Sequence, residues 1–202
     1  MRDLRGQKLC LATHNRGKAE EISALLQPYG VTLVTAADLG LPEPPETGVT
    51  FVENARIKAH AAAIASGMPA LSDDSGLCVD VLDGAPGVYT ADWAETPDGR
   101  NFALAMTRTW RAIVATGTPE PHHAQFCCTL VLAWPDGSDL VFEGRMAGRI
   151  IWPMRGDLGH GYDPVFQPDG SDQTFGEMDR WQKNRISHRA DAFARLVAMC
   201  FT

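Results

Sequence analysis

Short apolar runs that alternate with segments of helical periodicity restrict the fold of this chain more than any other feature of its sequence. The expected strands cover residues 9–12, 31–35, 70–72, 77–81, 124–134 and 140–149, and the expected helices cover a stretch around residues 22–26 and about residues 51–66, 101–116 and 187–200. Strands that alternate with helices are typical of α/β proteins, and the short loop at 135–138 predicts one antiparallel hairpin. The sequence therefore predicts an α/β fold with a mixed sheet.

Three connecting segments carry local signals. Residues 41–48 hold three prolines and cannot continue a strand, so they are expected to form a loop. Thr50 and Glu53 have the spacing of a capping box that opens the next helix, and Gly67 ends it. Residues 73–76, between two apolar runs, are expected to form an acidic turn.

The composition is that of one globular domain over residues 1–202. Its 45% hydrophobic and 21% charged residues allow a sizeable core and exclude a disordered chain. No run approaches the roughly 18 apolar residues of a membrane helix, and the first residues lack the apolar core of a signal peptide. We therefore expect a cytoplasmic protein without a membrane partner.

Charge and cysteine content exclude further classes. The chain has 18 Lys and Arg against 25 Asp and Glu, a formal net charge of −7, which disfavours a nucleic-acid partner. An anionic ligand must therefore be bound by a local site. The five cysteines are odd in number and form no CxxC pair, so we expect free thiols and neither a disulfide framework nor a zinc site.

A polar turn after the first strand has the residues of a phosphate site. Thr13, Asn15 and Lys18 lie where a strand ends and a helix begins, so backbone N–H groups, the helix dipole and an ammonium can meet there. It is not a Walker A loop. The alternative is an Asn/Gly turn that caps the helix, with Lys18 in solvent.

An acidic pair could hold a metal ion, and a polar helix face could line a cleft. Asp73 and Asp74 are adjacent, and Mg²⁺ prefers one or two carboxylates together with substrate phosphate oxygens. Glu46 lies in the proline-rich loop, and Lys58 shares a helix face with Asn54 at i and i+4. The alternatives are a solvated acidic turn and a solvated helix face.

Two segments near the C-terminus could bind a nucleobase. Glycines at 159 and 161 allow close backbone approach to a flat ligand, and the basic residues of 183–189 can donate to keto oxygens. The alternative is a surface turn followed by a basic helix start. Three of the four lysines, namely Lys18, Lys58 and Lys183, fall within the candidate segments.

Taken in order, the motifs ATHNRGK, PETGVTFVENARIKA, SDDSGLCVDVLDGAPGVYTA, GYDPVF and ISHRA resemble the inosine triphosphate pyrophosphatase (Ham1-like) family over about residues 9–196. The resemblance implies an elongated α/β fold of two lobes around a central active-site cleft, and a homodimer. It further implies Mg²⁺ dependence and hydrolysis of ITP, dITP and XTP to the monophosphate and pyrophosphate, which cleanses the nucleotide pool.

The resemblance also implies the roles of individual residues. Glu46 and Asp74 serve the metal, and Asp74 is also the proton acceptor; our reasoning on charge adds Asp73 as a ligand and Lys58 as a phosphate contact. The implied substrate-binding residues are Thr13, His14, Asn15, Arg16, Gly17 and Lys18 for the phosphates, and Ser75, His160, Gly161, Tyr162, Asp163, Lys183, His188 and Arg189 for the nucleoside. His160 departs from the usual aromatic residue, His14 from the common Gly, and Arg185 from a small residue.

Two other functions fit the same residues. One is a catalytically silent module that senses a nucleotide, which the intact acidic set argues against. The other is a phosphatase or kinase that acts on the γ-phosphate. Product analysis with ITP and Mg²⁺ distinguishes all three.

Overall fold

The computed structural model describes residues 3–201, apart from the side chain of Arg16. The strands are β1 (Lys8–Leu11), β2 (Thr32–Thr35), β3 (Ala70–Val79), β4 (Glu95–Thr96), β5 (Gly99–Arg100), β6 (His122–Ala133), β7 (Asp139–Ile150) and β8 (Phe166–Pro168). The α-helices are α1 (Arg16–Leu26), α2 (Phe51–Ser66), α3 (Phe102–Ala115), α4 (Arg180–Ile186) and α5 (His188–Cys200).

Six of the strands form one sheet in the order β2-β1-β3-β6-β7-β8. Strand β1 pairs in parallel with β2 and with β3, whereas β7 and β8 are antiparallel. The predicted α/β fold with a mixed sheet is confirmed. The predicted hairpin is confirmed as β6 and β7, and β4 and β5 form a second, small hairpin that the sequence analysis missed.

The chain divides into two compact units. The first comprises the chain up to Asp74, Cys128–Gly144 and the chain from Arg189 onward; the second comprises Ser75–Cys127 and Arg145–His188. The predicted arrangement of two lobes around a cleft stays a prediction.

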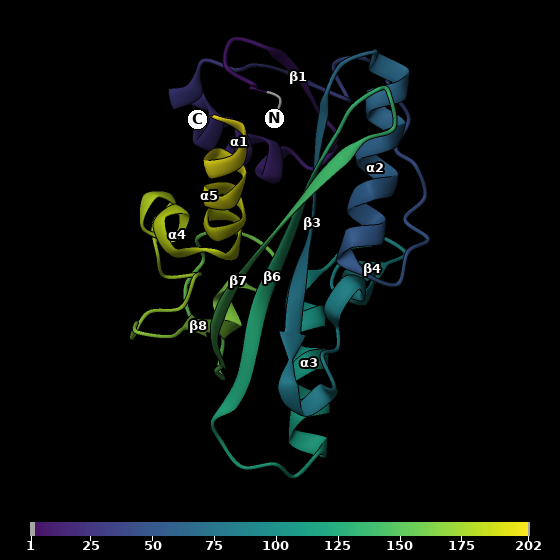
Figure 1. The fold of residues 1–202 in the computed structure, drawn as a ribbon. Helices are drawn as coiled ribbons and strands as arrows, with labels where there is room; N and C mark the ends of the chain where they lie inside the picture. Colours follow the sequence, from purple (N-terminus) through teal and green to yellow (C-terminus); the bar gives the residue numbers. More distant parts are fainter. Residues whose placement is uncertain (1–2, 202) are drawn as a thin grey trace. The chain divides into compact units, whose positions relative to one another are not determined.

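The first unit has three layers, with α1 and α5 on one face of the sheet and α2 on the other (Figure 1). Side chains alternate between the faces of a strand, so Leu9 and Leu11 of β1 join the core under α1 and α5. Cys10, between them, joins the core under α2, whose inner face consists of alanines and so approaches the sheet closely. Strand β1 is therefore buried on both faces, and it lies between β2 and β3 in the sheet.

Strand β3 corrects one expectation of the sequence analysis. The acidic turn predicted at 73–76 is wrong, because Ala70–Val79 forms one continuous strand. The strand was expected to reach Val81 but ends at Val79, and a 3₁₀ helix over Asp80–Leu82 follows it. Buried carboxylates are costly unless they are paired, and pairing with cations, described below, is what permits acidic residues inside this strand.

The second unit packs around a hydrophobic core that contains a cluster of aromatic side chains. Phe126 of β6 contacts Phe166 and Phe175, with ring centroids 4.7 and 5.9 Å apart, respectively. Tyr162 is also fully buried in this core. The core fixes the backbone around residues 159–164, the Gly-rich segment, which carries several of the predicted nucleoside contacts.

A polar clasp joins the β6–β7 hairpin to α2 in the first unit. Arg56 donates from two nitrogens to the two carboxylate oxygens of Asp139, at 3.0 and 3.2 Å, and His60 Nε2 lies 2.9 Å from Asp139 Oδ2. Although partial burial opposes the shift, hydrogen bonds from His60 and Arg56 hold the pKa of Asp139 below its usual value. The clasp is half-exposed at Arg56, so its contribution is modest.

We expect Asp139→Asn to lower the free energy of unfolding by about 1 kcal/mol, because the bidentate contact with Arg56 loses its charge. Since the pKa of Asp139 is depressed on folding, this contribution is present at neutral pH and is lost as the pH falls below the usual carboxyl range. Urea unfolding of the wild type and the variant at pH 7 and at pH 3 measures it. A loss of equal size at both pH values would contradict this account.

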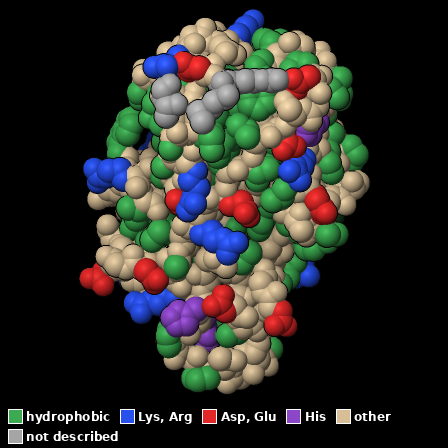
Figure 2. Space-filling model, viewed as in Figure 1, with side chains coloured by type: hydrophobic (Ala, Val, Ile, Leu, Met, Phe, Trp, Pro, Cys, Tyr) green, Lys and Arg blue, Asp and Glu red, His purple; other side chains and the backbone are tan. Residues whose placement is uncertain are grey.

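Lys and Arg side chains lie interspersed with Asp and Glu side chains over the face shown in Figure 2, without a continuous basic surface. Within residues 3–201, no helix is long and apolar enough to cross a membrane. All five cysteines are free thiols.

Candidate active site

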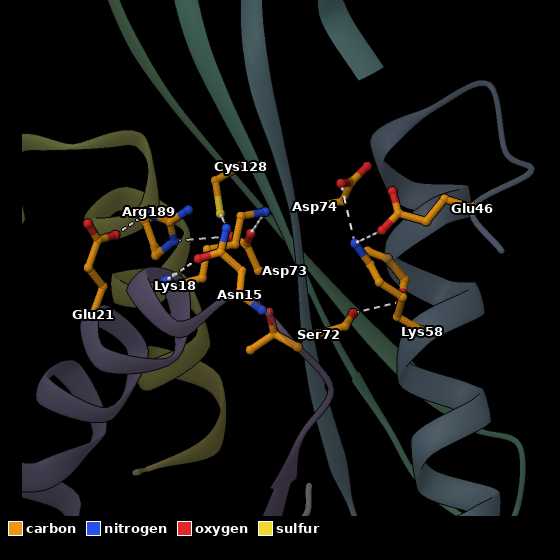
Figure 3. Close-up of polar contacts among 12 residues, drawn as sticks. Asn15, Lys18, Glu21, Glu46, Lys58, Ser72, Asp73, Asp74, Cys128 and Arg189 are labelled. Atoms are coloured by element: carbon orange, nitrogen blue, oxygen red, sulfur yellow. Dashed lines mark hydrogen bonds and ion pairs between the residues drawn. The ribbon is translucent and has the colours of Figure 1, made fainter. Parts of the chain in front are cut away.

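The alternation of side chains along β3 directs Asp73 and Asp74 to opposite faces of the sheet. Asp73 points to α1 and α5, and Asp74 points to α2 (Figure 3). Ser72, on the same face as Asp74, donates from Oγ to the Ala55 carbonyl of α2 at 2.6 Å, which joins the strand to that helix. The two adjacent carboxylates therefore have separate surroundings.

Asp73 is the centre of a buried ionic network. Lys18 of α1 forms an ion pair with one carboxylate oxygen, and Arg189 Nε donates to the other at 3.1 Å. Cys128 Sγ donates to that second oxygen at 3.1 Å, and Arg189 also pairs with Glu21 of α1. Burial alone would raise the pKa of Asp73, but the charges of Arg189 and Lys18 hold it well below its usual value.

Asp74 shares an ammonium with Glu46 on the other face. Lys58 Nζ lies 2.6 Å from Glu46 Oε1 and 3.4 Å from Asp74 Oδ1, and Lys58 is only 6% exposed. Burial raises the pKa of Asp74 to about 6, although the positive charges of Lys58 and Lys18 oppose the shift. Among the described residues, Asp74 Oδ2 has no hydrogen-bond partner. Asp74 thus offers one occupied and one open carboxylate oxygen.

The turn before α1 contains the helix cap that one interpretation predicted, whereas the phosphate site stays a prediction. Asn15 caps the helix, since its side chain accepts from the Lys18 N–H at 3.1 Å, and its own N–H donates to Thr13 Oγ1 at 3.1 Å. The alternative in which Lys18 lies in solvent is wrong, because its ammonium is bound to Asp73. Gly17 lies in the first turn of α1, and the side chain of Arg16 lies outside the described part of the structure.

Asn54 and Lys58 are both buried, so the alternative of a solvated helix face is wrong for this face of α2. The Gly48 N–H donates to Asn54 Oδ1 at 2.8 Å. A Cβ at Gly48 would lie 2.5 Å from the Glu53 Cβ, so only glycine allows this approach. The end of the proline-rich loop is thereby fixed to the start of α2.

Asp163 organises the Gly-rich segment of the second unit. Its Oδ2 accepts from Lys183 Nζ at 2.6 Å and from the His160 N–H at 2.8 Å. Gly159 adopts a φ of +77°, and a Cβ there would lie 2.1 Å from Asp163 Oδ2. Lys183 and Asp163 are both buried, so the turn is held by a desolvated ion pair.

The other residues predicted to contact the nucleoside have different surroundings. His188 is buried and stacks on Phe126 at 4.9 Å between centroids, with an interplanar angle of 14°. Tyr162 is buried, whereas His160 is exposed, and Ser75 directly follows Asp74 on β3. Within the second unit the structure therefore brings Asp163, Lys183 and the backbone of His160 together.

A family model decides where the chain belongs, because it matches residues 9–199 and describes the Ham1 family. The chain belongs to the Ham1 family. The resemblance that the ordered motifs carried is therefore confirmed.

Relatives and solved structures agree with Ham1 membership. The chain is 64% identical over 196 residues to a dITP/XTP pyrophosphatase of Ruegeria pomeroyi, covering 97% of this chain and 96% of that protein. It is 52% identical to a dITP/XTP pyrophosphatase of Agrobacterium fabrum, covering 99% of both. The structure of a Ham1 protein from Coxiella burnetii matches with a TM-score of 0.88 at 34% identity, covering 96% of this chain and 98% of that chain.

The carboxylate oxygens on the α2 face of the sheet suit a hard divalent cation better than those on the opposite face. Glu46 and Asp74 meet at one ammonium, and the buried Asp74 Oδ2 is without a partner among the described residues. No group of three or more metal-ligating His, Cys, Asp or Glu side chains occurs in the described part of the chain. Asp73 faces two cations and a thiol on the opposite face, so its predicted role as a ligand of the same metal stays a prediction.

The sequence analysis missed two members of the buried ionic network around Asp73. Glu21 lies three residues after Lys18 on α1, so the helical period already placed the two on one face, but nothing marked Glu21 as a partner of Arg189. Cys128 stood only as one of five thiols, and its hydrogen bond to Asp73 joins residues 55 apart. Arg189 was expected at the nucleoside; in the structure its guanidinium binds Asp73 and Glu21.

Proposed function

We propose that this chain hydrolyses ITP, dITP and XTP to the nucleoside monophosphate and pyrophosphate. Asp74 carries the proposal. Its Oδ2 is buried without a hydrogen-bond partner among the described residues, and its pKa of about 6 suits a proton acceptor near neutral pH. The name dITP/XTP pyrophosphatase, borne by relatives up to 64% identical, supports the same substrates.

The phosphates of the substrate are assigned to the first unit. A triphosphate carries about four negative charges, and Lys18, Lys58 and the N-terminus of α1 supply positive charge in a protein of net charge −7. Both ammonium groups already face carboxylates, so they are oriented before a substrate arrives. Such preorganisation lowers the cost of stabilising charge in the transition state.

Glu46 and Asp74 are the residues that would hold Mg²⁺, and the ion, when bound, would offset phosphate charge and stabilise the leaving pyrophosphate. The oxygen of a water molecule that Asp74 orients attacks the α-phosphorus. The bond from that phosphorus to the oxygen bridging to the β-phosphorus breaks, and one proton of the water passes to the Asp74 carboxylate. Lys18 and Lys58 offset the charge on the departing pyrophosphate.

Selection of the base is assigned to Lys183 and the segment it orders. A buried ammonium can donate to the 6-keto oxygen of hypoxanthine or xanthine. The 6-amino group of adenine would leave that donor unpaired, which costs on the order of 1 to 3 kcal/mol. The ion pair with Asp163 fixes the direction of the ammonium.

We expect Lys183→Gln to reduce the ratio of kcat/KM for ITP to that for ATP by about tenfold, because the charged donor is lost while an amide can still donate to Asp163. Steady-state assays with both substrates measure the ratio. The matched control is Lys8→Gln, since Lys8 is the fourth lysine and is exposed at the start of β1. An unchanged ratio for Lys183→Gln would remove Lys183 from base selection.

A panel of nucleoside triphosphates, assayed with Mg²⁺ and scored for pyrophosphate and orthophosphate, tests the proposed reaction. We expect pyrophosphate and the monophosphate from ITP, dITP and XTP, and far less from ATP. Orthophosphate as the first product would instead indicate a γ-phosphatase, and tight binding of ITP without products would indicate a sensor.

Ham1 membership also favours a homodimer in the cytoplasm that uses Mg²⁺ and binds neither nucleic acid nor membrane. Light scattering in solution tests the dimer. Omission of Mg²⁺, with readdition of Mg²⁺ or Ca²⁺, tests the metal.

A further inference from the structure

The loop that carries Glu46 has few attachments to the rest of the first unit. Within the described residues, no backbone–backbone hydrogen bond involves residues 42–47, and Pro42, Pro44 and Pro45 have no N–H to donate. The main-chain attachments of the loop lie at its ends, where the Leu41 N–H donates to the Ala36 carbonyl at 2.9 Å and the Gly48 N–H donates to Asn54 Oδ1. Between these ends, the side chain of Glu46 binds Lys58.

Close packing does not replace the missing hydrogen bonds. A cavity of about 110 Å³ lies between the first half of the loop and α2. The loop contributes Leu41, Pro42 and Pro44 to its lining, and the helix contributes Ala61, Ala62 and Ala65. The cavity is large enough to hold water, so this part of the loop does not pack directly against α2 across it.

His14 supplies a second side-chain attachment of the loop, besides the ion pair of Glu46 with Lys58 on α2. Its Nε2 lies 3.1 Å from the Leu41 carbonyl oxygen, which accepts a hydrogen bond when Nε2 carries the proton, and its Nδ1 lies 3.9 Å from Glu43 Oε1. His14 directly precedes Asn15, the cap of α1, so its backbone belongs to the turn that presents Lys18. The imidazole therefore links the Lys18 turn to the loop that bears Glu46.

We propose that His14 is a positioning residue, which holds the 41–46 loop so that Glu46 stays on Lys58 next to Asp74. The proposal rests on the proposed function. The hydrogen bond of the ring is made by Nε2, so donation from this atom to a substrate would require its contact with the Leu41 carbonyl to break. His14 thus acts on Glu46 through the loop.

The test compares His14→Ala with His14→Gln, whose amide can still donate to the Leu41 carbonyl. A glutamate-specific protease reports the loop directly, because it must take up the Glu46 side chain, which Lys58 holds while the loop stays in place, to cut the bond between Glu46 and Thr47. We expect His14→Ala to raise the rate of this cut by roughly five- to tenfold, as loss of one hydrogen bond predicts, and His14→Gln to restore it.

The same variants are assayed with ITP. We expect His14→Ala to lower kcat by roughly three- to tenfold with KM within twofold of the wild type, and His14→Gln to recover most of the loss. The matched control is His123→Ala, which removes an exposed histidine of β6. It should leave the cut and kcat unchanged.

A raised KM at unchanged kcat would overturn the proposal, because it would make His14 a substrate contact. So would unchanged cleavage at Glu46–Thr47 in His14→Ala, or faster cleavage with unchanged kcat. Failure of the proposed function is separable, since the wild type would then release no pyrophosphate from ITP while the protease assay, which needs no substrate, still reports the loop.

Discussion

Asp74→Asn is expected to lower kcat for ITP hydrolysis by at least about 10²-fold while the protein stays folded. The amide cannot accept the proton of the attacking water, and it is a weaker ligand for a divalent cation. The fold should survive, because Glu46 still pairs with Lys58, and burial already disfavours the charged form of Asp74.

Stopped assays for pyrophosphate measure the loss, and the midpoint of urea unfolding verifies the fold. Asp98→Asn is the matched control, because Asp98 is exposed in the turn between β4 and β5. Turnover within about threefold of the wild type in a folded Asp74→Asn variant would rule out Asp74 as the proton acceptor.

Asp73→Asn, in contrast to Asp74→Asn, is expected to destabilise the fold, with a loss of about 3 to 5 kcal/mol in the free energy of unfolding. The substitution leaves the buried guanidinium of Arg189 and the ammonium of Lys18 with one fewer countercharge. Because the pKa of Asp73 is depressed on folding, its contribution is complete at neutral pH and is lost only in acid.

Urea unfolding of Asp73→Asn and Asp74→Asn, side by side at pH 7, measures the contrast between adjacent residues of one strand. An unchanged unfolding midpoint for Asp73→Asn, combined with weaker binding of Mg²⁺, would contradict the account. It would support the ligand role that the sequence analysis gave to Asp73.

The contrast between these two residues shows where sequence reasoning succeeds and fails. The capping box at Thr50 and Glu53 is a local signal, and α2 begins and ends as predicted. The continuity of β3 was not predictable in the same way, because an Asp inside a strand is affordable only with a buried cation nearby. Asp73 has two such cations, and one of them is on Arg189, 116 residues further along the chain.

Other differences between the predictions and the structure arise from a local signal that was overlooked or from the unpredicted course of β3. Helix α4 was missed although Asp179 and Gln182 form a capping box that the sequence displays. Residues predicted for the site form two ion-paired groups in the structure, one of Lys18 with Asp73 and one of Lys58 with Glu46 and Asp74; their roles stay predictions. Which carboxylate faces which lysine depends on strand alternation, and the acidic turn expected at 73–76 obscured it.

Hydrolysis of ITP in ¹⁸O-labelled water tests the central claim most directly, because it locates the bond that breaks. We predict that one ¹⁸O atom appears in the inosine monophosphate and none in the pyrophosphate, as attack on the α-phosphorus requires. Label in pyrophosphate, or in orthophosphate released beside a nucleoside diphosphate, would contradict the account.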